Sequence, residues 1–180
     1  MARFTYDDWM ESQGIPIHRG YYVEDLRTVE LSWWEDRQVN AAFMQLRGME
    51  GVCEGRIEEI APGATQPPLK LSVDEQVYIL GGRGVATVWT DDSRPKKTFE
   101  WSTRSLFLIP RNSYCQLSNM DGQNPARLLH YNYLPVAMSA TPDPDFFFNN
   151  PYSGDSFLHS SEEFYSDAKA VMEKGEGHFA

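Results

Sequence analysis

Between Asn40 and Pro135 the sequence is a succession of short apolar runs separated by turn residues, and this pattern restricts the possible folds most strongly. The runs are rich in Val, Ile, Leu, Tyr, Phe and Trp, and Gly, Pro, Asn or Asp separate them. About nine strands without an intervening helix predict an antiparallel all-β sandwich or barrel. Several runs are apolar on both faces, which indicates a small barrel that is also covered outside, for example by a second subunit.

Helices are expected only outside this region. Near the N-terminus, Thr5 is positioned to cap a short helix that ends at Gly14, and one or two edge strands and a loop follow. Near the C-terminus, a proline-rich connector precedes a second helix that begins at Ser160 and extends up to Gly175. We therefore expect one structural domain overall with three segments: 1–39 (N-terminal helix and edge strands), 40–135 (barrel) and 136–180 (connector and helix).

Charge and hydropathy exclude two classes of partner. The formal net charge is −10, and the 16 basic residues are scattered rather than clustered. Such a field repels phosphate backbones, so we expect no nucleic-acid partner. No stretch approaches the ~18 apolar residues of a membrane span, and the first residues contain no apolar run typical of a secretory signal. We therefore expect no membrane partner and a cytoplasmic location.

The stretch from Gly63 to Gly82 has the spacing of a metal-binding motif. That motif runs from a glycine to a His-any-His pair, a glutamate and a second glycine. Gly63, Glu75 and Gly82 occupy the glycine and glutamate positions. Leu69 and Leu71 stand where the motif has its two histidines.

A second stretch matches the partner of this motif by spacing. The partner motif contains a glycine, a Pro-any-Gly turn, a histidine and an asparagine. This sequence retains two of these residues and replaces the other three. The five positions hold Arg104, Pro110, Asn112, Cys115 and Asn119.

Together the two stretches resemble the paired motifs of the cupin superfamily, in a type-2, RmlC-like variant that lacks the metal-binding histidines. The resemblance implies a double-stranded β-helix, or jelly-roll barrel, with a short N-terminal helix and a C-terminal helical extension. In cupins that match the motif, three histidines and the glutamate hold a divalent metal inside the barrel. Because Leu69 and Leu71 offer no lone pair, and Cys115 replaces the third histidine, we expect no metal and no other cofactor.

Two residues are candidates for catalysis. Glu75 at the retained motif position would be desolvated beside leucines, which would raise its pKa and suit it to proton transfer near neutral pH. The alternative is a glutamate that faces solvent or pairs with an arginine. His130, the only histidine within the predicted barrel, is a natural partner for Glu75. The alternative for His130 is a hydrogen-bonded core residue.

Other residues are expected to form a binding pocket. Leu69 and Leu71 are two positions apart and so share one face of a strand, which in the cupin register is the barrel lumen. Cys115 would lie across from them, and Tyr78 and Tyr131 could supply hydroxyl groups or stacking surfaces. The alternative is that the lumen is an ordinary packed core.

These expectations favour a metal-independent cupin enzyme that performs acid–base chemistry, such as isomerisation, cyclisation or elimination, on a small, largely apolar organic substrate bound in the lumen. Metal-free cupin epimerases and isomerases provide the family analogy. Two alternatives remain open: a non-catalytic small-molecule-binding or sensor protein, and an atypical metal-dependent, dioxygenase-like cupin. We also expect a homodimer.

Overall fold

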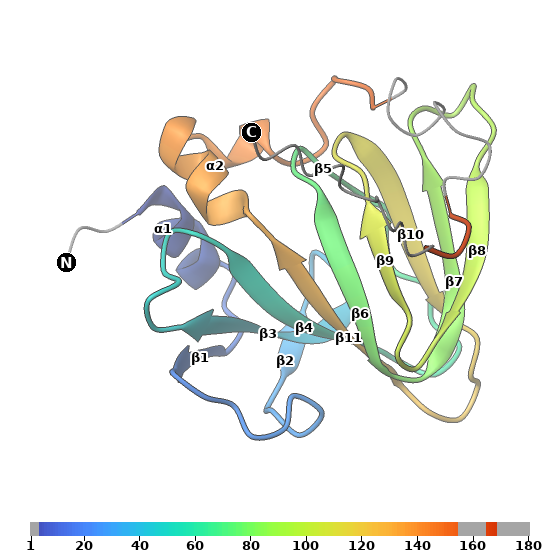
Figure 1. Cartoon of the computed structure of the whole chain (residues 1–180), viewed down its shortest axis with the longest axis horizontal. Helices are drawn as coiled ribbons and strands as arrows, with labels where there is room; N and C mark the ends of the chain where they lie inside the picture. Colours follow the sequence, from blue (N-terminus) through green and yellow to red (C-terminus); the bar gives the residue numbers. More distant parts are fainter. Residues whose placement is uncertain (1–3, 155–164, 169–180) are drawn as a thin grey trace, which may run out of the picture.

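Nine strands, β3 to β11, fill the region predicted as a barrel, and two short strands precede it (Figure 1). The structure is a computed structural model that describes residues 4–154 and 165–168. The predicted helix that begins at Ser160 falls largely outside the described residues. The strands are β1 (Ile17–Gly20), β2 (Ser32–Trp34), β3 (Val39–Leu46), β4 (Glu54–Ile60), β5 (Leu69–Leu71), β6 (Glu75–Gly81), β7 (Arg83–Trp89), β8 (Lys97–Ser102), β9 (Leu106–Ile109), β10 (Ser113–Asn119) and β11 (Ala126–Asn132).

The strands form two sheets that pack face to face as a jelly-roll. The larger sheet has the order β1-β3-β4-β11-β6-β9, with β2 also paired to β3, and the smaller has the order β5-β10-β7-β8. All pairings are antiparallel except that of β1 with β3. Alternate residues of most strands are buried, as expected where one face points into a core. The all-β prediction is confirmed.

The helices differ from the prediction in two details. Helix α1 (Thr5–Ser12) is present, but its N-cap is Phe4, so Thr5 is the first helical residue instead of the cap. Helix α2 (Leu134–Ala140) and the short 3₁₀ helix η1 (Pro144–Phe146) occupy the segment predicted as an irregular connector. Pro135 lies in the first turn of α2, where its missing N–H leaves no bond unmade. No described helix is long and apolar enough to cross a membrane.

Two tight turns preserve the backbone geometry of the resembled motif. Arg104 and Asn112 stand where the motif has glycines, and their φ angles are 77° and 57°. This left-handed region favours glycine, and an arginine there carries some strain. Arg104 therefore keeps a conformation that its side chain does not favour, whereas asparagine tolerates the left-handed region at position 112. Both turns agree with the motif alignment.

The segment after η1 closes one edge of the smaller sheet. Its backbone bonds to β5 and the turn after it: Ser72 N donates to Phe147 O at 2.9 Å, and Asn149 N donates to Lys70 O at 2.8 Å. Phe148 between them stacks on Trp9 of α1 with ring centroids 5.1 Å apart. In Figure 1, α1 and α2 lie together at one end of the larger sheet. This end of the barrel contains the pocket described below.

Asn119, a retained motif residue at the end of β10, holds three chain segments together. Its buried side-chain amide donates to the carbonyl oxygens of Ile60, Ala61 and Asn124 at 3.2, 3.1 and 2.9 Å. Its Oδ1 accepts from the backbone N–H of Asp121 at 2.9 Å. These bonds fix the end of β4 and the β10–β11 loop against β10.

We expect Asn119→Ala to lower the free energy of unfolding by about 2–4 kcal/mol, because it leaves buried carbonyl groups without their donor. Urea denaturation followed by tryptophan fluorescence measures this change. Gln123→Ala, in the same loop but exposed, is the matched control and should stay within about 0.5 kcal/mol of the wild type. Equal losses in the two variants would contradict a structural role for the Asn119 side chain.

Candidate functional site

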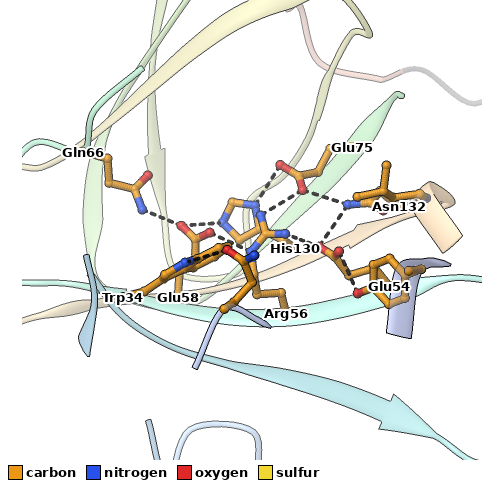
Figure 2. A network of polar contacts seen from close by, with 11 residues as sticks. Trp34, Glu54, Arg56, Glu58, Gln66, Glu75, His130 and Asn132 are labelled. Atoms are coloured by element: carbon orange, nitrogen blue, oxygen red, sulfur yellow. Dashed lines mark hydrogen bonds and ion pairs between the residues drawn. The ribbon is translucent and has the colours of Figure 1, made fainter. Parts of the chain in front are cut away.

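The interior of the barrel contains a buried cluster of charged and polar side chains, here called the lumen network (Figure 2). Strand β4 contributes residues at alternate positions, which therefore point to the same face. Strands β6 and β11 add the others, and the pairing of β11 with both β4 and β6 brings them together. The lumen network consists of Glu54, Arg56, Glu58, Glu75, His130 and Asn132.

Arg56 is the centre of the network and is 3% exposed. Its Nε donates to Glu58 Oε1 at 2.7 Å, its Nη2 donates to Glu75 Oε1 at 3.1 Å, and its Nη1 pairs with Glu54. Burial alone would lower the pKa of Arg56, but the three carboxylates outweigh it and the pKa is raised. The guanidinium is therefore charged, and the protein already supplies its partners.

Glu75 pairs with the second catalytic candidate. Its Oε2 lies 3.0 Å from Nδ1 of His130, and its Oε1 also accepts from Asn132 Nδ2 at 3.1 Å. Burial would raise the pKa of Glu75, but the charges of His130 and Arg56 overcome this effect and lower the pKa to about 2. The expectation of a raised pKa is therefore wrong. Glu75 is ionised at neutral pH and is paired with an arginine, as one sequence alternative proposed.

The other two glutamates of the network differ from each other in pKa. Burial opposes ionisation of Glu58, yet His130, Arg56 and Arg37 together lower its pKa. Burial raises the pKa of Glu54, and the attraction of Arg56 does not offset it. Glu54 Oε2 also accepts a hydrogen bond from the Tyr6 hydroxyl at 2.8 Å. Glu54, and not Glu75, is thus the carboxyl group of the network whose pKa is raised.

His130 lies between two carboxylates and is 2% exposed. In addition to the Glu75 contact, its Nε2 is 3.5 Å from Glu58 Oε2. That distance is within ion-pair range, but Nε2 has no hydrogen-bond partner in the described part of the chain. The structure thus brings the two catalytic candidates into contact, deep inside the barrel.

A pocket of about 420 Å³ opens at the α1 end of the barrel, next to the lumen network. We call it the barrel pocket. Leu69 and Leu71 line it, as the sequence predicts for a lumen wall. Two cationic side chains, Arg37 and Arg56, also reach it. Its apolar wall consists of Trp9, Trp34, Leu69, Leu71, Leu134 and Phe148.

The remaining predicted binding residues lie elsewhere. Cys115 is buried opposite Leu69 in the β5–β10 pairing but does not line the barrel pocket. Tyr78 and Tyr131 are 37% and 43% exposed, because their positions in β6 and β11 alternate with the lumen-facing ones. Tyr131 lines a separate apolar groove of about 450 Å³, where its hydroxyl lies 2.9 Å from Cys53 Sγ. The two tyrosines therefore do not face the lumen, which corrects the expectation that they form part of a pocket there.

The residues at the motif positions do not fit the metal that the resemblance implies. Leu69 and Leu71 have no donor atom, and burial together with the nearby charge of Glu75 raises the pKa of the Cys115 thiol. The fourth position, Glu75, is already bonded to Arg56, His130 and Asn132. Within the described residues, no group of three or more His, Cys, Asp or Glu side chains is arranged to hold a metal ion.

The sequence reasoning missed most of the lumen network. Glu54, Arg56 and Glu58 alternate along β4 with a period of two, which is the signal that they share one face. Charged residues are rarely buried, so such a face is ordinarily assigned to solvent. Arg37, which belongs to the turn between β2 and β3, has no such signal.

We expect the lowered pKa of Glu75 to make the protein sensitive to acid. An ionised Glu75 stabilises the fold above its ordinary pKa of 4.5, and this contribution is lost as the pH falls toward its folded-state pKa of about 2. The loss should reach about 2 kcal/mol by pH 3 from this residue alone. Urea denaturation at pH 7 and at successive values down to pH 3 measures it.

In Glu75→Gln the free energy of unfolding should fall less steeply over the same pH range, because the titrating group is absent. The comparison uses the slope with pH, since the variant also removes one of the three carboxylates that pair with Arg56 and is less stable at every pH. Glu24→Gln, which alters an exposed side chain, should retain the wild-type slope. If the free energy of unfolding of Glu75→Gln fell with pH as steeply as that of the wild type, the lowered pKa of Glu75 would be contradicted.

Comparison with protein-family profiles and with characterised proteins finds no match to this sequence. Solved structures do match. Peruvianin-I, a cysteine peptidase from Thevetia peruviana latex, superposes with a TM-score of 0.52 at 12% identity, over 63% of this chain and 72% of that one. The Schizosaccharomyces pombe Cnp3 cupin domain has a TM-score of 0.49 and 23% identity, over 61% of this chain and 66% of that domain.

Lactobacillus farciminis oxalate decarboxylase, solved as a formate complex, has a TM-score of 0.49 and 15% identity; the match covers 76% of this chain and 36% of the decarboxylase. At these identities the likeness concerns the fold only. The two antiparallel sheets, the retained Asn119 and the left-handed turns at Arg104 and Asn112 agree with the motif spacing. The chain has the double-stranded β-helix fold of the cupins.

Proposed function

We propose that this chain binds a small, largely apolar organic molecule in the barrel pocket. The observation that carries the proposal is the wall of the pocket, in which tryptophan, leucine and phenylalanine side chains surround a space of about 420 Å³. Ligand sites are commonly about 300–1,000 Å³ in volume and mostly apolar, with a few polar groups that orient the ligand. The barrel pocket combines such an apolar wall with polar residues, among which Asp36, Arg37 and Arg56 are charged.

The arrangement of the lumen network favours a binding function over a catalytic function. Its carboxylates already bond to Arg56, His130 and Asn132, and they lie behind Arg56 relative to the pocket. Neither Glu75 nor His130 lines the pocket. A ligand at the pocket wall would contact Arg56 first, and the acidic groups lie beyond it.

Metal-independent acid–base chemistry, of the isomerase, cyclase or lyase type, is the second candidate function. The 3.0 Å contact between Glu75 and His130 favours it, because a carboxylate that holds an imidazole in this way orients a general base. In this proposal His130 moves the proton and Glu75 positions it, which reverses the roles expected from the sequence. The substrate must then reach past Arg56.

The predicted homodimer and cytoplasmic location stay predictions.

Binding can be tested with N-phenyl-1-naphthylamine, a neutral apolar dye that becomes fluorescent when buried. We expect saturable fluorescence enhancement with the wild type and at least about a tenfold weaker response with Leu69→Trp, whose larger side chain fills the pocket. Leu106→Trp places the same residue on an exposed position of β9 and should bind the dye as the wild type does. Equal binding by all three proteins would place the dye elsewhere, for example in the groove beside Tyr131.

Proton transfer can be tested with phenylacetone, an apolar ketone with exchangeable α-protons. If the second candidate function holds, the protein accelerates deuterium incorporation in D₂O, measured by ¹H NMR, and His130→Gln abolishes the acceleration while dye binding persists. His18→Gln, which alters a histidine of β1 outside the lumen network, is the control. Acceleration that survives in His130→Gln would remove His130 from the mechanism, and no acceleration in the wild type would count against this chemistry for α-acidic ketones.

A further inference from the structure

Arg37 is a buried cation at the wall of the barrel pocket. It lies in the tight turn between β2 and β3, where its backbone N–H donates to Trp34 O at 3.2 Å, and it is 8% exposed. The turn places its guanidinium among the pocket-lining residues together with Trp34 and Arg56. The side chain is therefore held inside the pocket wall by a fixed backbone.

The guanidinium of Arg37 lacks the partners that Arg56 has. Among the described residues, its side chain forms one hydrogen bond, from Nη1 to Pro67 O, a long contact of 3.3 Å. Its Nε is buried and has no partner in the same part of the chain. The ion pairs between described residues all involve other cations, whereas Arg56 pairs with three glutamates. Burial accordingly lowers the pKa of Arg37, and the charge of Glu58 offsets this only in part.

An unpaired buried guanidinium is costly, since buried charges in proteins are normally paired and hydrogen-bonded. If this position served stability alone, an apolar residue of similar volume would fill it at least as well as Arg37, because it carries no charge to bury. A bound anion would supply the missing partner. A guanidinium presents parallel N–H groups in a planar fork that matches a carboxylate.

We propose that the natural ligand of the barrel pocket is an organic monocarboxylate whose carboxylate group pairs with Arg37, an inference that rests on the proposed binding function. The aliphatic or aromatic body of the ligand packs against Trp9, Trp34 and Leu69. A single negative charge fits because, among the described residues that line the pocket, Arg37 forms no ion pair, while Arg56 pairs with three glutamates. Asp36 at the exposed rim and the carboxylates behind Arg56 would repel a second anionic group.

The test uses a pair of probes of almost equal shape, benzoate and benzamide, in isothermal titration calorimetry with the full chain. We expect the wild type to bind benzoate about 10- to 100-fold more tightly than benzamide, the range that a charge-assisted hydrogen bond provides. Phenylacetate with phenylacetamide, and hexanoate with hexanamide, repeat the comparison for other body shapes. Displacement of N-phenyl-1-naphthylamine from the wild type, together with weaker benzoate binding by Leu69→Trp, locates the binding in the barrel pocket.

Two variants separate the charge from the geometry. Arg37→Met should abolish the preference for carboxylates, because it removes the guanidinium with which the carboxylate pairs. Arg37→Lys keeps the charge, loses the fork and should retain only part of the preference. Arg47→Met, which alters an arginine over Tyr21 far from the pocket wall, should behave as the wild type does.

The outcomes distinguish this inference from the proposed function. If each acid and its amide bind equally, or if Arg37→Met keeps the preference, the carboxylate inference is overturned while binding in the pocket stands. If the dye and all six probes fail to bind, both proposals are overturned. If inorganic phosphate displaces benzoate at comparable concentration, Arg37 is a general anion site and the assignment to monocarboxylates is wrong.

Discussion

The buried guanidinium of Arg56 is the interaction on which the interior of this barrel depends. Three glutamates from two strands converge on it, and each of them would be costly to bury without it. Removing any partner of such a cluster leaves an uncompensated charge in a medium of low dielectric. The lumen is therefore stabilised as a unit, and the positions of β4, β6 and β11 relative to each other are fixed by charge as well as by backbone pairing.

This arrangement explains how a cupin barrel can hold its shape where leucines replace the metal-binding histidines. A divalent ion in such a barrel would draw side chains from several strands to one point. Here the Arg56 guanidinium provides a positive charge, and Glu75 bonds to it and to His130. Leu69 and Leu71 line the barrel pocket.

Parts of the site could be predicted from the sequence, for a physical reason. Leu69 and Leu71 line the pocket as expected, because the period of a strand places residues two apart on one face. His130 and Glu75 meet as expected, since the motif spacing fixes one strand and the apolar neighbours of His130 indicate another. Tyr78 and Tyr131 are candidates for binding from the sequence, but both faces of their strands are apolar, so the period alone does not give the direction of their side chains. Helix α2 is not predicted, because Pro135 ends the predicted barrel and the residues after it are predicted as a proline-rich connector.

The sequence by itself determined the class of fold, through the succession of short strands and turns, and the absence of donor atoms at two motif positions, through Leu69 and Leu71. The tertiary structure alone decided the protonation state of Glu75. Its pKa depends on Arg56 and His130, which lie 19 and 55 residues away along the chain. Burial can be guessed from local sequence and raises a carboxyl pKa, but the charges that reverse the shift come from other strands. Only the pairing of those strands brings them within hydrogen-bonding distance.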